Sequence, residues 1–105
     1  MTTDIGTPSL EALRDLRREI GRLVREHHAS NVRVFGSVVR GDAGPESDYD
    51  FVVDLDPNLG ALEAFDNLDR LEGDLSQLLG RPTHVVTAAH DSAFTRRVLQ
   101  DARPL

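Results

Sequence analysis

Residues 35–41 and 47–55 read FGSVVRG and SDYDFVVDL, and these two segments decide the fold of the 105-residue chain. The first completes a short β-branched and aromatic run over 32–35, which is typical of a buried strand that stops at a turn. The second follows a Gly-Pro turn and is dense in strand formers from Tyr49 to Leu55. The pattern predicts two strands joined by a turn or short helix over residues 38–45.

Helices are expected on both sides of this strand pair. Thr7 as a cap and Pro8 at the first helical position predict a helix that ends near His28, with apolar residues recurring every three or four positions. A second amphipathic pattern predicts a helix from about residue 59 to 79, which a Gly-Arg-Pro segment terminates. The expected apolar stripe of this helix consists of Leu62, Phe65, Leu68, Leu71, Leu75, Leu78 and Leu79.

A third strand and a closing helix complete the predicted fold. The strand runs from Thr83 to Thr87, and the helix is capped by Asp91 or Ser92. The expected inward residues of the closing helix are Phe94, Val98 and Leu99, and a short tail follows it. The order αβ(α)βαβα predicts an α/β (α+β) fold, in which a small mixed β-sheet is flanked by helices.

Composition narrows the possible functions. At this length we expect one domain over residues 1–105, with residues 1–6 flexible. Cysteine is absent, which excludes disulfides, thiolate zinc sites and cysteine nucleophiles, and all 12 basic residues are arginine, which excludes lysine chemistry. Neither a signal peptide nor a membrane span is evident, so a cytoplasmic protein without a membrane partner is expected. The net charge of −6 makes direct nucleic acid binding unexpected.

Gly36 and Ser37 lie where the first strand ends and a helical turn begins. Backbone N–H groups and a hydroxyl therefore point outward at the positive end of that turn, which suits a phosphate group. Gly36 has no side chain and lets a triphosphate approach the backbone, while Ser37 can donate a further hydrogen bond. The alternative is a tight turn with a helix cap and no ligand.

Asp48 and Asp50 are two residues apart at the start of the second strand. The pleat places both carboxylates on one face, and such a pair repels unless a cation lies between them. Mg²⁺ commonly takes one or two protein carboxylates, with water and substrate phosphates in its other positions. The alternative is a solvated strand start. The phosphate turn about a dozen residues upstream favours a Mg-nucleotide site.

Together these segments resemble the signature of the DNA polymerase β-type nucleotidyltransferase superfamily, in particular its minimal nucleotidyltransferases. The resemblance extends to Leu-Leu-Gly-Arg-Pro at 78–82 and to the closing Arg-Pro-Leu. It implies a small enzyme in which Gly36 and Ser37 hold the β and γ phosphates of a nucleoside triphosphate, and in which Asp48 and Asp50 bind Mg²⁺, with a pair of metal ions expected. The implied reaction transfers AMP from ATP to an acceptor hydroxyl, and pyrophosphate leaves.

Position 84 departs from this resemblance, which implies a third carboxylate where His84 stands. A neutral imidazole can act as a general base near pH 7, but it is a poor Mg²⁺ ligand. Three alternatives remain: His84 is the base of an altered enzyme, the register differs and Asp54 supplies the third charge, or the protein binds nucleotide with little or no transfer. Asp54 lies about 13 Å from Asp50 at ~3.3 Å per residue, too far to share its metal.

The remaining polar candidates have less specific signals. Arg40 can contact phosphate or close the loop, and its alternative is a surface ion pair with Asp42 or Glu46. The other histidines carry no spacing that indicates a site, and solvated or capping roles are expected for His27, His28 and His90.

The sequence leaves two candidate functions, an enzyme and a binding protein. Minimal nucleotidyltransferases are often antitoxins that silence a HEPN-domain toxin by adenylylating a tyrosine on it, so the resemblance implies an ATP-dependent antitoxin of this kind with a HEPN toxin as its partner. The alternative is a catalytically degenerate protein that neutralises the same partner by binding alone. Transfer to small molecules such as aminoglycosides is disfavoured, because those relatives carry extra domains for the acceptor.

Overall fold

The strand-forming runs of the sequence build one mixed sheet. The computed structural model describes residues 7–88 and 92–105, and within them four strands lie in the order β3-β2-β1-β4. β1 is antiparallel to both β2 and β4, whereas β2 and β3 are parallel. The strands are β1 Ala29–Phe35, β2 Tyr49–Leu55, β3 Thr83–Thr87 and β4 Arg103–Pro104.

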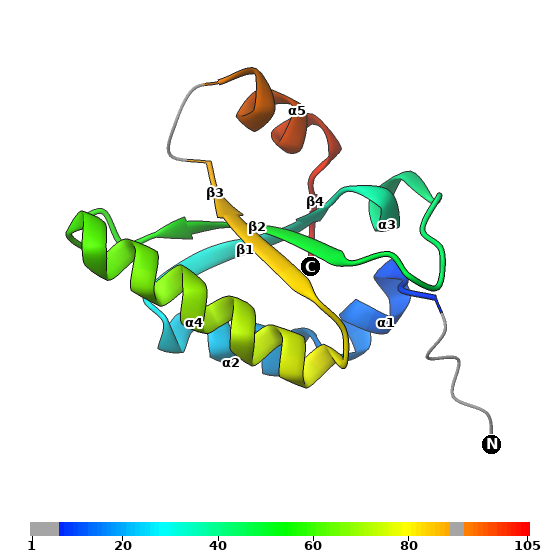
Figure 1. Cartoon of the computed structure of the whole chain (residues 1–105), viewed down its shortest axis with the longest axis horizontal. Coiled ribbons are helices and arrows are strands. Elements are labelled where there is room, and N and C mark those ends of the chain that lie inside the picture. Colours follow the sequence, from blue (N-terminus) through cyan, green and yellow to red (C-terminus); the bar gives the residue numbers. More distant parts are fainter. Residues whose placement is uncertain (1–6, 89–91) are drawn as a thin grey trace.

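Helices cover the sheet from two sides, with α1, α2 and α4 below it and α3 and α5 above it in Figure 1. Their bounds are α1 Leu10–Asp15, α2 Arg17–Glu26, α3 Ser37–Arg40, α4 Ala61–Leu79 and α5 Ala93–Asp101. The predicted α/β (α+β) fold is therefore confirmed. Residues 1–6, the possible cap Asp91 and His90 lie outside the described residues.

The first helix and the end of the chain differ from the predicted order. Ser9, not Thr7, caps α1, and its Oγ accepts the N–H of Ala12 at 3.0 Å. The helix breaks at Leu16, where φ is −107° and the N–H bonds the carbonyl three residues back at 3.0 Å. Residues 103–104, predicted as tail, pair with β1 as a strand. Two residues carry no alternation, so only the packed structure reveals this pairing.

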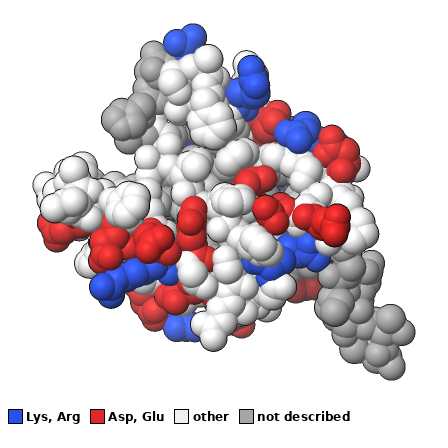
Figure 2. All heavy atoms as spheres, viewed as in Figure 1, with Lys and Arg blue, Asp and Glu red and all other residues white. Residues whose placement is uncertain are grey.

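Charged side chains cover much of the surface on the face shown in Figure 2, where acidic residues run from α4 across the middle of the face. Helix α5, at the top of Figure 1, carries the exposed Arg96 and Arg97. In the described part of the chain, none of the helices combines the length and the apolar character that crossing a bilayer requires.

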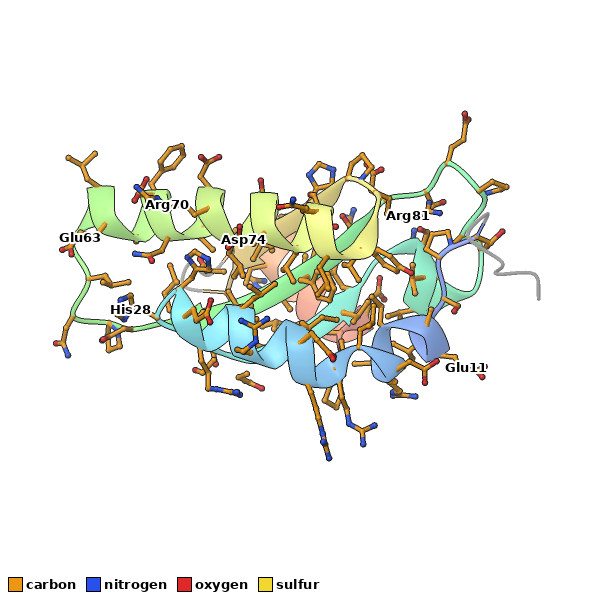
Figure 3. The ribbon with its side chains drawn as sticks, turned by 90° about the horizontal axis from the view of Figure 1, so that it is seen from below. Glu11, His28, Glu63, Arg70, Asp74 and Arg81 are labelled. Atoms are coloured by element: carbon orange, nitrogen blue, oxygen red, sulfur yellow. The ribbon has the colours of Figure 1, made fainter. Side chains whose placement is uncertain are left out.

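Alternation along β2 divides its residues between two faces. Tyr49, Phe51 and Val53 are buried and belong to one hydrophobic cluster with residues of α1, α2 and α4. Figure 3, seen from the helical side, shows α4 and the α1–α2 pair lying side by side across the sheet. Asp50 and Val52 alternate with the core residues and lie on the opposite face. The other buried members of the cluster include Leu13, Ile20, Val24, Val34, Leu71, Leu75 and Val85.

The predicted apolar stripes of α4 and α5 are wrong at some positions. Leu62 and Phe65 are 86% and 71% exposed, because the first turns of α4 extend past the ends of the strands (Figure 1). Phe94 and Leu99 are 59% and 43% exposed, whereas Val98 is buried as predicted. Only one narrow face of α5 therefore packs against the sheet.

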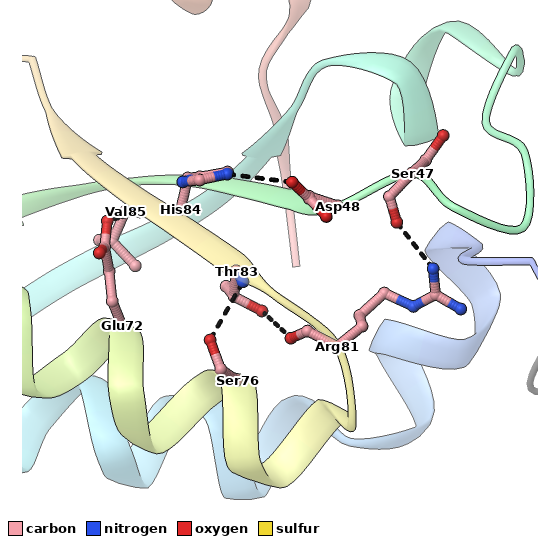
Figure 4. Close-up of polar contacts among 8 residues, drawn as sticks. All are labelled: Ser47, Asp48, Glu72, Ser76, Arg81, Thr83, His84 and Val85. Carbon is pink, nitrogen blue, oxygen red and sulfur yellow. Dashed lines mark hydrogen bonds and ion pairs between the residues drawn. The ribbon is translucent and has the colours of Figure 1, made fainter.

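Side chains of α4 satisfy the outer edge of β3 (Figure 4). Ser76 Oγ accepts the N–H of Thr83 at 3.1 Å, and Glu72 Oε2 accepts the N–H of Val85 at 2.8 Å. These residues are two apart, so their amides point to the same side of the strand, away from β2. The helix thus fixes β3 both by its apolar face and by two hydrogen bonds.

His27 links α2 to α4, beyond the capping role expected for it. It occupies the C-cap position of α2, and its Nε2 lies 2.7 Å from Oδ2 of Asp74. Its side chain is only 14% exposed. His28 is exposed, in the left-handed region at φ 61°, where the chain turns into β1.

Candidate active site

A pocket of about 570 Å³ lies on the sheet face opposite the hydrophobic core. The ends of β1, β2 and β3 form its floor, and α3 and α5 form its walls. Its lining contains residues of opposite charge beside aromatic and aliphatic side chains. They are Phe35, Gly36, Ser37, Arg40, Asp50, His84, Val86, Phe94, Arg97, Val98 and Asp101.

The turn from β1 into α3 requires glycine at position 36. Gly36 has φ 86° and ψ −154°, a conformation that other residues adopt only with strain. A Cβ atom there would lie 2.5 Å from Oδ2 of Asp50. Ser37 then opens α3, in which the N–H groups of Val39 and Arg40 both donate to the carbonyl oxygen of Gly36 at 3.1 Å. The expected combination of an open backbone turn and a hydroxyl is therefore found at the pocket, next to a carboxylate.

The β2–β3 register brings the predicted carboxylates and the histidine together. Asp50 is directly opposite His84 in the parallel pair, and His84 Nε2 lies 3.1 Å from Oδ2 of Asp48 (Figure 4). An ionised carboxylate only accepts hydrogen bonds, so Nε2 carries the proton of this bond. In the neutral ring Nδ1 is then the unprotonated nitrogen. Asp48 itself precedes β2 and borders the pocket through His84.

Electrostatics at the site favour a bound cation. Burial raises the pKa of Asp50 above its ordinary value of 3.8. The nearby Asp48 carboxylate raises this pKa further, while His84 and Arg40 act in the opposite direction. The ionised form of Asp50 thus lacks full compensation from the protein alone. A positive charge between the two carboxylates would supply it.

Arg81 holds the loop that carries Asp48, a role that sequence reasoning missed. Its Nη1 donates to the carbonyl oxygen of Ser47 at 2.7 Å (Figure 4) and to that of Pro45 at 3.0 Å. Its guanidinium also lies 5.9 Å from the centroid of the Tyr49 ring. The sequence indicates the Gly-Arg-Pro segment as a helix terminator and as part of the family resemblance, but nothing local reveals which backbone an arginine will reach.

Arg40 lies at the pocket and also forms a surface ion pair. It lines the pocket, and its side chain lies 3.5 Å from Oδ2 of Asp42 and 3.4 Å from Oδ2 of Asp101. The Asp42 pair was one of its predicted alternatives. The Asp101 contact joins α3 to the end of α5 and could not be predicted from sequence spacing.

The residues present suit a hard divalent cation with a small protein ligand set. Asp48 and Asp50 supply oxygen donors, and Gly36 leaves space beside Oδ2 of Asp50. Among the described residues, no group of three or more His, Asp or Glu side chains is arranged to hold a metal ion. Such a site needs further oxygen ligands from water and phosphate, as is usual for Mg²⁺.

Asp54 lies apart from this site and is engaged elsewhere. Its Oδ1 accepts from Arg33 at 2.8 Å, and its Oδ2 accepts from Asn31 at 3.0 Å. The register pairs Asp54 with Ser30, toward the far end of β2 from Asp50. The alternative in which a shifted register makes Asp54 the third carboxylate receives no support from this geometry.

Helix α5 supplies pocket residues that the sequence did not indicate as functional. Phe94, Arg97, Val98 and Asp101 all line the pocket. Phe94 and Val98 were predicted as inward positions of the closing helix, whereas Arg97 and Asp101 were assigned no role. Their placement depends on how α5 returns over the sheet, which no local pattern encodes.

The comparisons agree with this geometry. The family model of the nucleotidyltransferase domain matches residues 13–105. A solved chain assigned as a minimal nucleotidyltransferase is 35% identical, with a TM-score of 0.73 over 93% of this chain and 97% of that chain. No curated protein matches the sequence.

Two further solved structures share the fold at lower identity. A toxin–antitoxin complex with AMP-PNP contains a chain that is 20% identical, with a TM-score of 0.66 over 83% of this chain and 69% of that chain. A tyrosine-to-alanine variant of the toxin–antitoxin complex MntA–HpeT gives 20% identity and a TM-score of 0.62, over 85% and 69% of the two chains. The domain match and the 35% identical relative carry the assignment. The chain belongs to the nucleotidyltransferase domain family, and this family supports a transferase enzyme.

Proposed function

We propose that this protein transfers AMP from ATP to an acceptor hydroxyl. One observation carries the proposal: the Gly36–Ser37 turn, the Asp50 carboxylate and the His84 imidazole border one pocket, with Asp48 bonded to that imidazole. In-line displacement at phosphorus needs alignment and charge neutralisation more than covalent catalysis. The pocket offers groups for both tasks.

The chain's own residues divide the work as follows. Gly36 and Ser37 hold the β and γ phosphates through backbone N–H groups and the hydroxyl, and Arg40 adds positive charge beside them. Asp48 and Asp50 hold Mg²⁺, which when bound neutralises phosphate charge.

The acceptor oxygen forms a bond to the α-phosphorus while the bond from that phosphorus to the bridging oxygen breaks, and pyrophosphate leaves. Nδ1 of His84 takes the proton of the acceptor hydroxyl, and the Asp48 carboxylate orients the ring through Nε2. The tautomer that this role requires is the one that the Asp48 hydrogen bond favours.

The proposed acceptor is a tyrosine hydroxyl on a partner toxin of the HEPN class. Two solved structures with this fold are toxin–antitoxin complexes, and one of them contains AMP-PNP, an ATP analogue. These neighbours support a toxin as partner and ATP as donor. Such a chain is then the antitoxin of the pair.

Binding without transfer is the second candidate function. One observation favours it. His84 stands where the resemblance implies a carboxylate, and its Nε2 already forms a hydrogen bond with Oδ2 of Asp48. In that case the protein neutralises its partner by covering it, and the nucleotide pocket is a remnant.

Transfer is tested by incubating the protein with α-labelled ATP, Mg²⁺ or Mn²⁺, and a HEPN-domain protein encoded beside it. We expect label on the partner, and its loss in the Asp48→Ala/Asp50→Ala double variant. Asp54→Ala is the matched control, because Asp54 lies on the same strand and pairs with Arg33 instead.

The two candidates give different results in this assay. A tight complex that stays unlabelled with either metal would overturn the enzymatic proposal and favour neutralisation by binding. His84→Asp separates them further. A sharp rise in labelling would mark the histidine as degeneration, whereas a fall would support its role as the base.

A further inference from the structure

One face of α5 forms a continuous wall of the pocket. Phe94, Arg97, Val98 and Asp101 occupy positions i, i+3, i+4 and i+7, which lie on one side of a helix, and all four line the pocket. Phe94 is nevertheless 59% exposed. A phenylalanine that borders a pocket and stays open to solvent has an unused aromatic face.

The two ends of this wall lie against different parts of the site. Asp101 accepts from Arg40 Nη1 at 3.4 Å, so the last turn of α5 is next to α3 and the phosphate turn. Phe94 is seven residues earlier, or about 10.5 Å along the helix axis at 1.5 Å per residue. That separation is comparable to the reach of a nucleoside triphosphate from its terminal phosphates to its base.

Arg97 lies between these ends and supplies a second cation to the pocket lining. Arg40 is shared between Asp42 and Asp101, whereas Arg97 forms no ion pair with any residue in the described ranges 7–88 and 92–105. Its position one turn before Asp101 sets it nearer the middle of a ligand that spans the wall. A phosphate close to the nucleoside would meet this guanidinium.

We propose that α5 is the nucleoside-binding wall of the pocket, with Phe94 stacking on the base and Arg97 contacting the α-phosphate. The inference rests on the proposed function and adds the residues that bind the donor. Stacking on a phenylalanine reads the π-face of a base and not its hydrogen-bonding edge. The wall therefore discriminates little between bases, adenine and guanine included.

The experiment measures binding by calorimetry in Mg²⁺, without an acceptor protein. The two probes are α,β-methylene-ATP, which cannot be split at the reacting bond, and inorganic tripolyphosphate, which lacks the nucleoside. Phe94→Ala is paired with Leu99→Ala, an exposed residue of the same helix outside the pocket lining. Arg97→Gln is paired with Arg22→Gln, an exposed arginine of α2 that pairs with Glu26.

Phe94→Ala is expected to weaken α,β-methylene-ATP roughly tenfold and to leave tripolyphosphate unchanged. Arg97→Gln is expected to weaken both probes, and Phe94→Trp to restore nucleotide binding. The controls Leu99→Ala and Arg22→Gln are expected to match the unmodified protein.

Distinct results would overturn the inference or the function beneath it. Unchanged nucleotide binding in Phe94→Ala, or an equal loss of both probes, would overturn the stacking role while leaving the proposed function intact. An unmodified protein that binds neither probe would remove the proposed function, and this inference with it.

Discussion

Replacing Gly36 by alanine tests the close contact between the Gly36–Ser37 turn and the carboxylate of Asp50. The new methyl group would be placed 2.5 Å from Oδ2 of Asp50, at a residue with φ 86°. Backbone strain of this kind costs about 1–3 kcal/mol, and forced repacking costs about 1–3 kcal/mol more. We therefore expect Gly36→Ala to lower the free energy of unfolding by about 2–6 kcal/mol in urea denaturation.

The matched control is Gly80→Ala at the end of α4. Gly80 also has a positive φ, 71°, but a Cβ atom there would meet nothing within 4 Å. Gly80→Ala should therefore lower the free energy of unfolding only by the strain of a left-handed residue, about 1–2 kcal/mol. Because Asp50 must move to admit the methyl group, Gly36→Ala should also weaken Mg-nucleotide binding in calorimetry, whereas Gly80→Ala should not. Equal stability losses with normal nucleotide binding in both variants would refute the proposed crowding at Asp50.

Three further predictions concern the site and the core. Asp50→Asn should raise the free energy of unfolding of the metal-free protein at pH 7. Burial raises the pKa of Asp50 above 3.8, so the folded protein loses stability as pH rises above that value and the carboxyl group ionises, whereas asparagine stays neutral. The gain should vanish in melts below that pH, and a gain that is independent of pH would contradict it. Arg81→Ala should lower the free energy of unfolding by about 1.5–3 kcal/mol and weaken metal-nucleotide affinity in titrations, because the loop before Asp48 loses two hydrogen bonds. Unchanged affinity would show that this loop keeps its conformation without Arg81. Leu75→Ala, fully buried, should cost about 2–5 kcal/mol in chemical denaturation, against at most about 0.5 for Leu62→Ala, which is 86% exposed.

Local sequence signals predicted the parts of the fold that depend on local chemistry. The bounds of β2 and β3 were predicted residue for residue, and α4 ends at Leu79, before Gly80, as expected. Alternation, β-branching and a left-handed glycine act within a few residues. The start of β1 was missed. It begins at Ala29, and the strand passes an irregularity between Ser30 and Arg33. A strand interrupted in this way has no regular alternation to detect.

The candidate site divides in the same manner. Gly36, Ser37 and Asp50 could be predicted as neighbours because they lie at the ends of adjacent strands, and the structure brings them to one pocket with His84. Their roles in binding and catalysis stay predictions. The contribution of α5 was not predictable, because it depends on the direction in which a helix returns over the sheet. Phe94 illustrates the reason: a helical pattern treats every phenylalanine as core and cannot distinguish one that faces a pocket.

The two hydrogen bonds from α4 to the rim of β3 have a consequence for self-association. An unpaired strand rim is a template on which another polypeptide can extend a sheet, and that route leads to aggregation. Here the N–H groups of Thr83 and Val85, which a strand from another chain would need, already donate to the Ser76 hydroxyl and the Glu72 carboxylate. Helix α4 thus hydrogen-bonds the outer edge of β3 and shields it from pairing with another chain. The face of β3 that carries His84 stays open to a ligand in the pocket.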